Sequence, residues 1–405
     1  MMEKCKFLIL GAGPAGLTFA NALREAGQEN FIVCEKEKCA GGLCRSADVD
    51  GAPLDVGGGH FLDVRRPEAN QFLFRFMPEN EWNLFERDSR IEIDGMTIGY
   101  PIEAHIWQMS LEMQILYLKS IAYAGCNVGL PVPKKFKDWI RWKLGDMICD
   151  NYMIPYNSKM YGMALSHLGT YWLDKLPNVS FDETLRSCLQ RAAYGSLPGH
   201  SRFYYPKKYG YGELWSRMAE EIAPHLKYEW CVKCIDFNHR IVEFSNQSKI
   251  EAEYIIVTIP WTSIEQYVGM PLELMRDIKK LKYTSINITY IPQTLDTSAH
   301  WIYCPDMQYS YHRILVRSNF CEGGKGYWTE TNSERYVNEG NLSFINEYAY
   351  PLNTMEKPDV MDNLLKWTKG RAVYGLGRWG EWQHYNSDVV VERALKLAAD
   401  MRCIT

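Results

Sequence analysis

"LILGAGPAGLTFANALREAG", from Leu8 to Gly27, decides the fold of this chain. The apolar run before Gly11 is typical of a buried parallel strand, and the glycines that follow have the spacing G-x-G-x-x-G. Gly11 permits a tight turn, Gly13 lets a pyrophosphate approach the backbone, and Gly16 lets the helix pack against the strand. We expect a helix over about residues 15–26, with an N-terminus that favours a phosphate.

An acidic residue follows at the spacing that dinucleotide binding needs. "FIVCEKE" predicts a second strand, and its Glu35 lies roughly 20 residues beyond Gly16. A carboxylate there accepts hydrogen bonds from both ribose hydroxyls of an adenosine, and it repels a 2′-phosphate. The glycine turn is therefore predicted to bind the ADP-ribose part of FAD or NAD.

Later glycine-rich segments favour FAD over NAD. "CAGGLCRS" places Gly41 and Gly42 after the second strand, and "APLDVGGGHF" predicts another glycine-rich turn after a strand. Downstream, "EAEYIIVTIP" is typical of a buried strand, and "VYGLGRWGEW" precedes a final helix expected over about residues 388–401. Four such signals spread along the chain suit one extended FAD, whereas a compact NAD-binding half-domain would not need them.

Composition narrows the class of protein. The chain has 405 residues, 46% of them hydrophobic, which is enough for a large core and for two or three lobes. Its net charge of -4 favours neither nucleic acid nor an anionic membrane surface as a partner. We expect no membrane span, no signal peptide and a cytoplasmic location with reduced thiols. The 12 cysteines lack zinc spacing, so no metal site is expected.

Taken together, the motifs resemble the FAD-binding superfamily of amine oxidases, porphyrinogen oxidases and UDP-galactopyranose mutases. The segments that resemble mutase motifs, in order along nearly the full chain, are "GGLCRSADVDGAPLDVGGGHF", "GYPIEAHI", "IPYNSKMYGM", "YYPKKYGYGELW", "IYCPDMQYSYHRILVRSNF", "NEYAYPL" and "GRWGEWQHYNSD". The chain is thus similar to the mutase branch, especially its eukaryotic type. The resemblance implies a mixed α/β (α+β) fold: a Rossmann-like FAD-binding domain, a helical lobe and a substrate domain built on an antiparallel sheet.

Periodicity and the resemblance together suggest the layout of these parts. We assign the FAD-binding domain to residues 1–95, 200–270 and 365–405. Helical periodicity marks residues 100–195 as the lobe, and alternating strand patterns mark residues 275–355 as the antiparallel sheet.

The resemblance also assigns roles to individual residues. It implies that His60 at the flavin face and Arg313 at a sugar-nucleotide pyrophosphate are catalytic. It implies FAD contacts for Gly11, Gly13, Gly16, Glu35, Gly41, Gly42, Leu43, Gly58, Gly59, Val232, Gly377, Arg378, Asn386 and Asp388. It implies substrate contacts for Glu103, Asn157, Tyr161, Lys175, Tyr303, Tyr350 and His384.

Departures from the family pattern are concentrated in the substrate half. Glu103 replaces a glutamine, which removes two donors and adds charge. Lys175 stands where a second pyrophosphate arginine is expected, and a lysine lacks the planar fork of an arginine. Tyr161 replaces a tryptophan, His384 replaces a tyrosine, and one extra glycine precedes His60. These changes favour a different activated sugar or another kind of substrate.

Simpler interpretations stand beside several of these roles. Arg313 could be a solvated arginine, His60 a core histidine bonded to backbone, and Asn157 a helix cap. Tyr303 and Tyr350 could serve packing alone. The segment "KKFKDW", from Lys134 to Trp139, resembles a basic membrane-surface helix, and a solvated helix face with snorkelling lysines is the simpler interpretation.

Two enzymatic functions follow from the resemblance. The first is a mutase that isomerises the ring form of a nucleotide sugar through an adduct at N5 of reduced FAD, with NAD(P)H as the reductant. The second is an FAD-dependent oxidase or desaturase, which suits an apolar pocket without a diphosphate clamp. A flavin-binding protein without catalysis is a third interpretation. The expected partner is a small molecule, and the sequence leaves the oligomeric state open.

Overall fold

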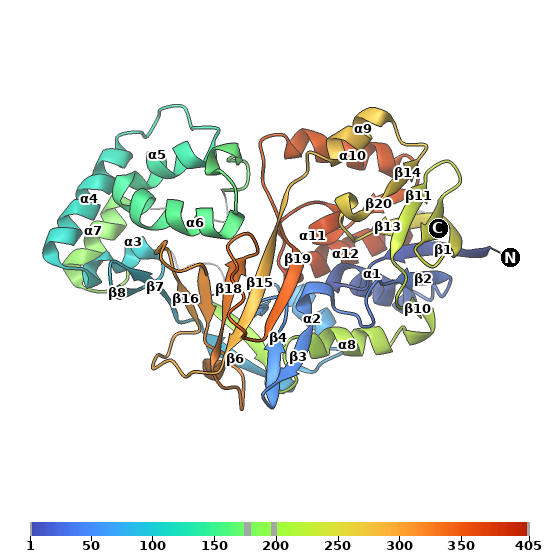
Figure 1. The fold of residues 1–405 in the computed structure, drawn as a ribbon, viewed down its shortest axis with the longest axis horizontal. Coiled ribbons are helices and arrows are strands. Elements are labelled where there is room, and N and C mark those ends of the chain that lie inside the picture. Colours follow the sequence, from blue (N-terminus) through green and yellow to red (C-terminus); the bar gives the residue numbers. More distant parts are fainter. Residues whose placement is uncertain (1, 174–179, 196–200, 403–405) are drawn as a thin grey trace.

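The computed structural model describes residues 2–173, 180–195 and 201–402. An eight-stranded sheet with its helices lies near the two termini, a seven-stranded sheet occupies the centre, and a helical lobe lies at the opposite end (Figure 1). This arrangement confirms the mixed α/β fold class predicted from the sequence.

The eight-stranded sheet contains the two parallel strands that precede and follow the glycine-rich turn and its helix. Its order is β10-β2-β1-β13-β12-β11-β14, and β20 pairs with β13. The strands are β1 (Glu3–Leu10), β2 (Phe31–Cys34), β10 (Leu226–Lys227), β11 (Val232–Asp236), β12 (Ile241–Phe244), β13 (Lys249–Val257), β14 (Gln266–Val268) and β20 (Val373–Gly375). The last four residues of β1 and all of β2 are buried, as expected for parallel strands with both faces covered.

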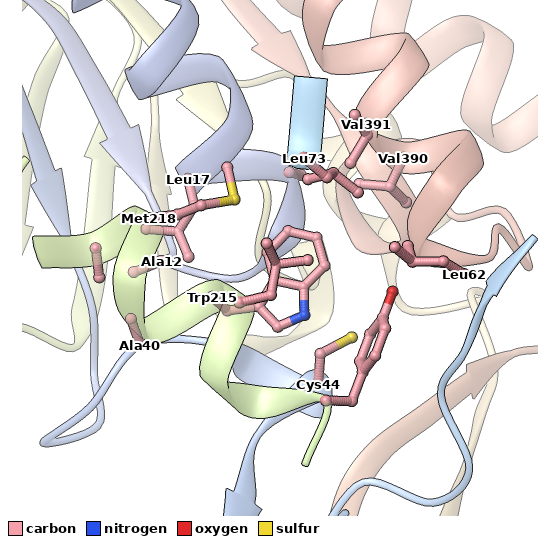
Figure 2. Packing of buried hydrophobic residues seen from close by; sticks show 14 of the residues in the cluster. Ala12, Leu17, Ala40, Cys44, Leu62, Leu73, Trp215, Met218, Val390 and Val391 are labelled. Carbon is pink, nitrogen blue, oxygen red and sulfur yellow. The ribbon is translucent and has the colours of Figure 1, made fainter. Parts of the chain in front are cut away.

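Three helices from distant parts of the chain form the core beside this sheet. They are α1 (Pro14–Glu25), α8 (Gly212–Glu220) and α12 (Ser387–Arg402). The indole of Trp215 lies among side chains of all three helices, including Leu17 and Val390, and is fully buried (Figure 2). The predicted helices near residues 15–26 and 388–401 are thus confirmed with ends shifted by one residue.

The seven-stranded sheet has the order β19-β15-β18-β17-β16-β7-β8. Its strands are β7 (Ser89–Ile93), β8 (Met96–Gly99), β15 (Tyr283–Ile291), β16 (Trp301–Tyr303), β17 (Arg313–Leu315), β18 (Tyr327–Asn332) and β19 (Ser343–Pro351). Every pair is antiparallel except β16 with β7. The predicted end of the first FAD-binding segment, residue 95, falls inside the β7–β8 hairpin. This hairpin joins the seven-stranded sheet because β7 pairs with β16.

The helical lobe contains α3 (Ile102–His105), α4 (Leu111–Gly125), α5 (Phe136–Ile148), α6 (Ile154–Tyr161) and α7 (Phe181–Gln190). Within the described ranges, no helix is both long and apolar enough to cross a bilayer. The remaining elements are β3 (Ser46–Val49), β4 (Ala52–Asp55), β5 (Leu62–Asp63), α2 (Pro67–Leu73), β6 (Trp82–Glu86), β9 (Arg202–Pro206), α9 (Leu272–Ile278), α10 (Lys357–Lys369) and α11 (Gly377–Gly380).

The Trp215→Ala substitution tests the core beside the glycine turn. We expect the free energy of unfolding to fall by about 3–5 kcal/mol, because the surrounding helices cannot refill the space of a buried indole. Urea denaturation followed by circular dichroism measures the change. The control Leu189→Ala removes an exposed side chain of α7 and should change stability by less than about 0.5 kcal/mol. An equal effect of the two substitutions would show that Trp215 is not a core contact.

Candidate active site

The turn between β1 and α1 leaves no room for a side chain at Gly11 or at Gly16. Gly11 has a φ of +105°, in the region that favours glycine. A Cβ on Gly16 would lie 2.0 Å from the carbonyl oxygen of Gly11, so the helix packs directly on the turn. Gly13 precedes the first residue of α1, and no side chain caps this N-terminus. The first N–H groups of α1 are therefore suited to bind a phosphate.

Glu35 lies beside this turn at the carboxyl end of β2. Its buried carboxylate accepts hydrogen bonds from the backbone N–H of Ala12 (2.8 Å) and of Glu37 (3.0 Å). The N–H of Trp230 donates to the carbonyl of Glu35 (2.8 Å), which brings the segment just before Val232 to the same edge of the sheet. The acid, the glycine turn and the predicted FAD contact at Val232 therefore share one edge.

A second backbone turn faces the first. Gly41 and Gly42 have positive φ angles of +107° and +54°, and the N–H of Gly41 donates to the carbonyl of Ala12 (2.8 Å). A Cβ on Gly42 would lie 3.3 Å from the Cα of Gly13. Two bare backbone turns thus converge where a dinucleotide pyrophosphate needs close approach, and this geometry fits FAD.

Further glycines keep the neighbouring turns equally close. A Cβ on Gly57 would lie 1.8 Å from the carbonyl oxygen of Leu43, and one on Gly58 would lie 2.7 Å from a carboxylate oxygen of Glu330. Gly377 has a φ of +76°, and a Cβ added to it would lie 2.7 Å from the Cβ of Ala15 on α1. The predicted cofactor glycines are therefore positions where backbone packs against backbone or buried side chains.

A cavity of about 230 Å³ lies between the glycine turn at residues 57–60, the segment before α12 and the seven-stranded sheet. The structure brings eight of the residues predicted from the sequence to its wall: Gly59, His60, Tyr303, Arg313, Tyr350, Arg378, His384 and Asn386. Sequence reasoning did not single out the other charged residues of the wall, which are Arg87 and Glu330.

A buried ion pair holds Arg313 in place. Arg313 and Glu330 face each other across β17 and β18, and two guanidinium nitrogens of Arg313 donate to one Glu330 oxygen, Nε at 2.8 Å. Burial alone would raise the pKa of Glu330, but the charges and hydrogen bonds of Arg313 and His312 together outweigh it and lower the pKa to about 2. The N–H of Gly59 donates to the other oxygen (3.3 Å). The sequence offered one signal for Glu330, an acid in the strand-like run "YWTETN".

Arg378 adds a second positive charge. Its guanidinium donates to the carbonyls of Ala349 (3.0 Å) and Tyr385 (2.9 and 3.0 Å), and burial lowers its pKa. None of these acceptors is a carboxylate, and no ion pair of Arg378 is found among the residues that the structure describes. The positive charge of Arg378 therefore has no acidic neighbour to balance it in the cavity wall.

His60 is placed as a neutral imidazole. Burial, followed by the charge of Arg378, lowers its pKa to about 4. Its Nδ1 lies 2.9 Å from the carbonyl oxygen of Gly58, which can only accept, so the proton of the neutral ring is assigned to Nδ1. Nε2 is then an acceptor at the cavity wall. The simpler interpretation of His60, a histidine bonded to backbone, is therefore correct for Nδ1. Nε2 can still accept a proton or a hydrogen bond from a ligand.

Two tyrosines complete the polar wall. Arg313 donates to the hydroxyl of Tyr350 (3.4 Å), whose ring lies 4.7 Å from that of His384. Arg87 donates to the hydroxyl of Tyr303 (2.5 Å), and its guanidinium stacks 4.8 Å from the ring of Trp301. Three guanidinium groups and one paired carboxylate thus line the cavity, which makes it attractive to anions.

Several predicted residues lie away from this cavity wall. Asn157 and Tyr161 are buried on α6, and the Asn157 amide donates to the carbonyl of Met153 (2.7 Å). Glu103 lies on α3, where burial raises its pKa to about 7. Asp388 is buried in the first turn of α12, 3.6 Å from Arg66. Their assigned contacts stay predictions.

Lys175 lies outside the described residues, so its role also stays a prediction. No group of His, Cys, Asp and Glu side chains suited to a metal ion is found in the described part of the chain.

Comparison with known proteins gives the family context of this site. A family model described as "Flavin containing amine oxidoreductase" matches residues 14–291. A UDP-galactopyranose mutase from Mycoplasma pneumoniae is 21% identical over 98% of this chain and 96% of its own length. A further match, 44% identical over 52 residues, is an "uncharacterized protein in nifH2 3′region" of Methanothermococcus thermolithotrophicus. It covers 13% of this chain and 49% of that protein.

Solved structures share the fold over the whole chain. A crystal structure of reduced UDP-galactopyranose mutase superposes with a TM-score of 0.90 at 21% identity, covering 99% of this chain and 94% of that one. A protein from Exiguobacterium sp. 255-15 assigned as a protoporphyrinogen oxidase gives a TM-score of 0.73 at 13% identity, covering 100% of both chains. The arrangement of all three parts therefore follows the mutase structure more closely than that oxidase structure.

The Glu35→Ala substitution tests the dinucleotide edge. We expect the affinity for FAD to fall by about 10- to 100-fold, because a hydrogen bond to a charged group contributes about 1.5–3 kcal/mol. Flavin fluorescence titration of the apoprotein measures the dissociation constant. Glu37→Ala is the matched control, since its half-exposed carboxylate forms ion pairs with Lys36 and Arg45 only, among the described residues. Equal affinities of the two variants would remove Glu35 from the cofactor site.

The pH dependence of stability tests the neutral state of His60. Its folded-state pKa of about 4 lies below the usual 6.5, so the unfolded chain binds more protons between these values. The free energy of unfolding should therefore fall as the pH is lowered from 6.5 towards 4. His60→Gln should show a shallower fall in urea unfolding of the flavin-bound protein. Identical pH slopes for the two proteins would contradict a buried neutral imidazole.

Proposed function

Because the chain belongs to the flavin containing amine oxidoreductase family, we propose that it is an FAD-dependent mutase that isomerises the ring form of a nucleotide sugar. The observation that carries the proposal is the cationic cavity wall, where Arg313 is held charged by Glu330 and Arg378 has no acidic neighbour among the described residues. A nucleotide diphosphate is the anionic part of such a substrate, and paired guanidinium groups recognise it.

The residues at the sheet edge fit FAD as the cofactor. Glu35 would hold the ribose, the N-terminus of α1 and the backbone of Gly13 and Gly42 would hold the pyrophosphate, and Gly59 and His60 would border the flavin. When bound and reduced, the flavin supplies a nucleophile at N5, and we propose NAD(P)H as its reductant. The protein's part is to hold the sugar carbon beside that nucleophile and to exclude water.

The two arginines act on the leaving group. Negative charge grows on the diphosphate as its bond to the sugar breaks, and a preorganised cation stabilises that charge. Glu330 fixes the Arg313 guanidinium so that it need not reorganise during the reaction, and Tyr350 directs a hydroxyl to the same region. The same contacts retain the diphosphate until the sugar ring has closed again.

His60 supplies a proton acceptor. Its Nδ1 proton is engaged by Gly58, so Nε2 can accept a proton from a sugar hydroxyl and return it later. A pKa of about 4 makes it a weak base, and we therefore assign it mainly to orienting that hydroxyl by a hydrogen bond.

Oxidation of an amine or a porphyrinogen is the second candidate function, because the family description names amine oxidoreductases. Phe61, Phe203 and Trp301 give the cavity one apolar wall that suits such a substrate. The charge of the cavity opposes an amine, since Arg313 and Arg378 would repel an ammonium group. We therefore favour the mutase.

Arg313→Lys tests the proposal while keeping the charge beside Glu330. The variant loses the planar fork, and we expect kcat/KM for the substrate to fall on the order of 100-fold. The flavin is reduced anaerobically, a panel of nucleotide sugars is added, and pyranose and furanose forms are separated by chromatography. Arg276→Lys, on the exposed face of α9, is the control and should keep full activity. If no nucleotide sugar is converted and amines reduce the oxidised flavin, the enzyme is an oxidase.

A further inference from the structure

The connection between α4 and α5 presents apolar side chains to solvent. Val128, Leu130 and Val132 are 84%, 55% and 58% exposed, and we call these three residues the apolar tip. Tyr123, in the last turns of α4, is 72% exposed and adds an aromatic side chain beside the tip. The connection runs along the top edge of the helical lobe in Figure 1, from the end of α4 to the start of α5.

Three exposed lysines follow the tip directly. They are Lys134, Lys135 and Lys137, and residues 126–137 contain no acidic side chain. Between them, Phe136 is fully buried at the start of α5 and ties the lysines to the lobe. The net charge of the whole chain is -4, so this local excess of positive charge stands out against its surroundings.

The structure changes the interpretation of the basic segment. Phe136 and Trp139 pack into the core of the lobe, so α5 cannot lay an aromatic face on a membrane. The simpler interpretation of this segment, a solvated helix face, is therefore correct for α5 itself. The exposed apolar groups belong instead to the loop before it, and that loop plays no part in the cavity described above.

We propose that the α4–α5 connection is a docking site for an anionic lipid surface. Aliphatic side chains on a projecting loop can enter the boundary between headgroups and acyl chains, while neighbouring lysines contact lipid phosphates and carboxylates. The binding is peripheral, since no described helix is suited to cross a bilayer. A second copy of this chain is a poorer occupant, because a twofold contact would bring the same lysines together.

Cosedimentation of the flavin-bound protein with lipid vesicles tests the proposal. The wild type should sediment with vesicles of mixed phosphatidylserine and phosphatidylcholine and should stay in solution with phosphatidylcholine alone. Changing Lys134, Lys135 and Lys137 to Gln should weaken partitioning on the order of 100-fold, since each lysine near an anionic surface contributes about a fivefold effect. Val128, Leu130 and Val132 changed together to Ser should also lose binding.

A matched control separates the docking site from general charge. Lys279, Lys366 and Lys369 are exposed lysines on α9 and α10 and their ends, and their change to Gln alters the net charge equally. This control should bind vesicles like the wild type, and all variants should keep the flavin spectrum and circular dichroism of the wild type. Equal losses in control and test variants would overturn the proposal.

Two further outcomes would also overturn it. One is no sedimentation of the wild type with either vesicle. The other is self-association in analytical ultracentrifugation that the serine variant abolishes, which would identify the apolar tip as an interface between copies. Neither outcome bears on the mutase proposal, whose test uses soluble substrates and the variant at Arg313.

Discussion

The contact between Gly16 and the carbonyl oxygen of Gly11 is the constraint on which the site depends. A Cβ would lie 2.0 Å from that oxygen, so only a bare backbone lets α1 pack this closely on the end of β1. The position of α1 then places its N-terminus beside Glu35 and against the second glycine turn at Gly42. The position of the phosphate-binding N-terminus of α1 in the proposed cofactor edge therefore depends on this close approach.

A second constraint governs the substrate side. Arg313 and Glu330 meet because β17 and β18 pair in one register, and a shift by one residue would turn Glu330 away from Arg313. A buried ion pair is costly to desolvate and contributes little to stability by itself. Here its effect is to hold one charged guanidinium in a fixed direction at the cavity wall. The cofactor edge and the anion-attracting wall thus belong to separate sheets, and the turn of Gly59 and His60 contacts the second sheet through Glu330.

Local patterns in the sequence were sufficient for much of the fold. The parallel strands β1, β2 and β13, the helices α1 and α12 and the strand pattern of residues 275–355 were predicted because each has its own periodicity and turn residues. Strand β7 was assigned to the FAD-binding domain, whereas it belongs to the seven-stranded sheet, since alternation predicts a strand but does not name its partner. Glu330 and Arg87 were missed because their immediate sequences do not show whether the charged side chain is buried or solvated, even though Glu330 lies in a strand-like run.

The sequence by itself determined the glycine turn and the acid that follows it, because these depend on residues close together in the chain and on glycines that no other residue can replace. Its resemblance to a known family indicated the mixed α/β class. Only the tertiary structure decided which charges share the cavity, that His60 is neutral, and that Asn157 and Tyr161 lie away from its wall. Those properties depend on burial and on distances between segments far apart in the chain, such as Gly59 and Glu330, which are 271 residues apart. Electrostatic interactions act through space, and sequence patterns report only what lies along the chain.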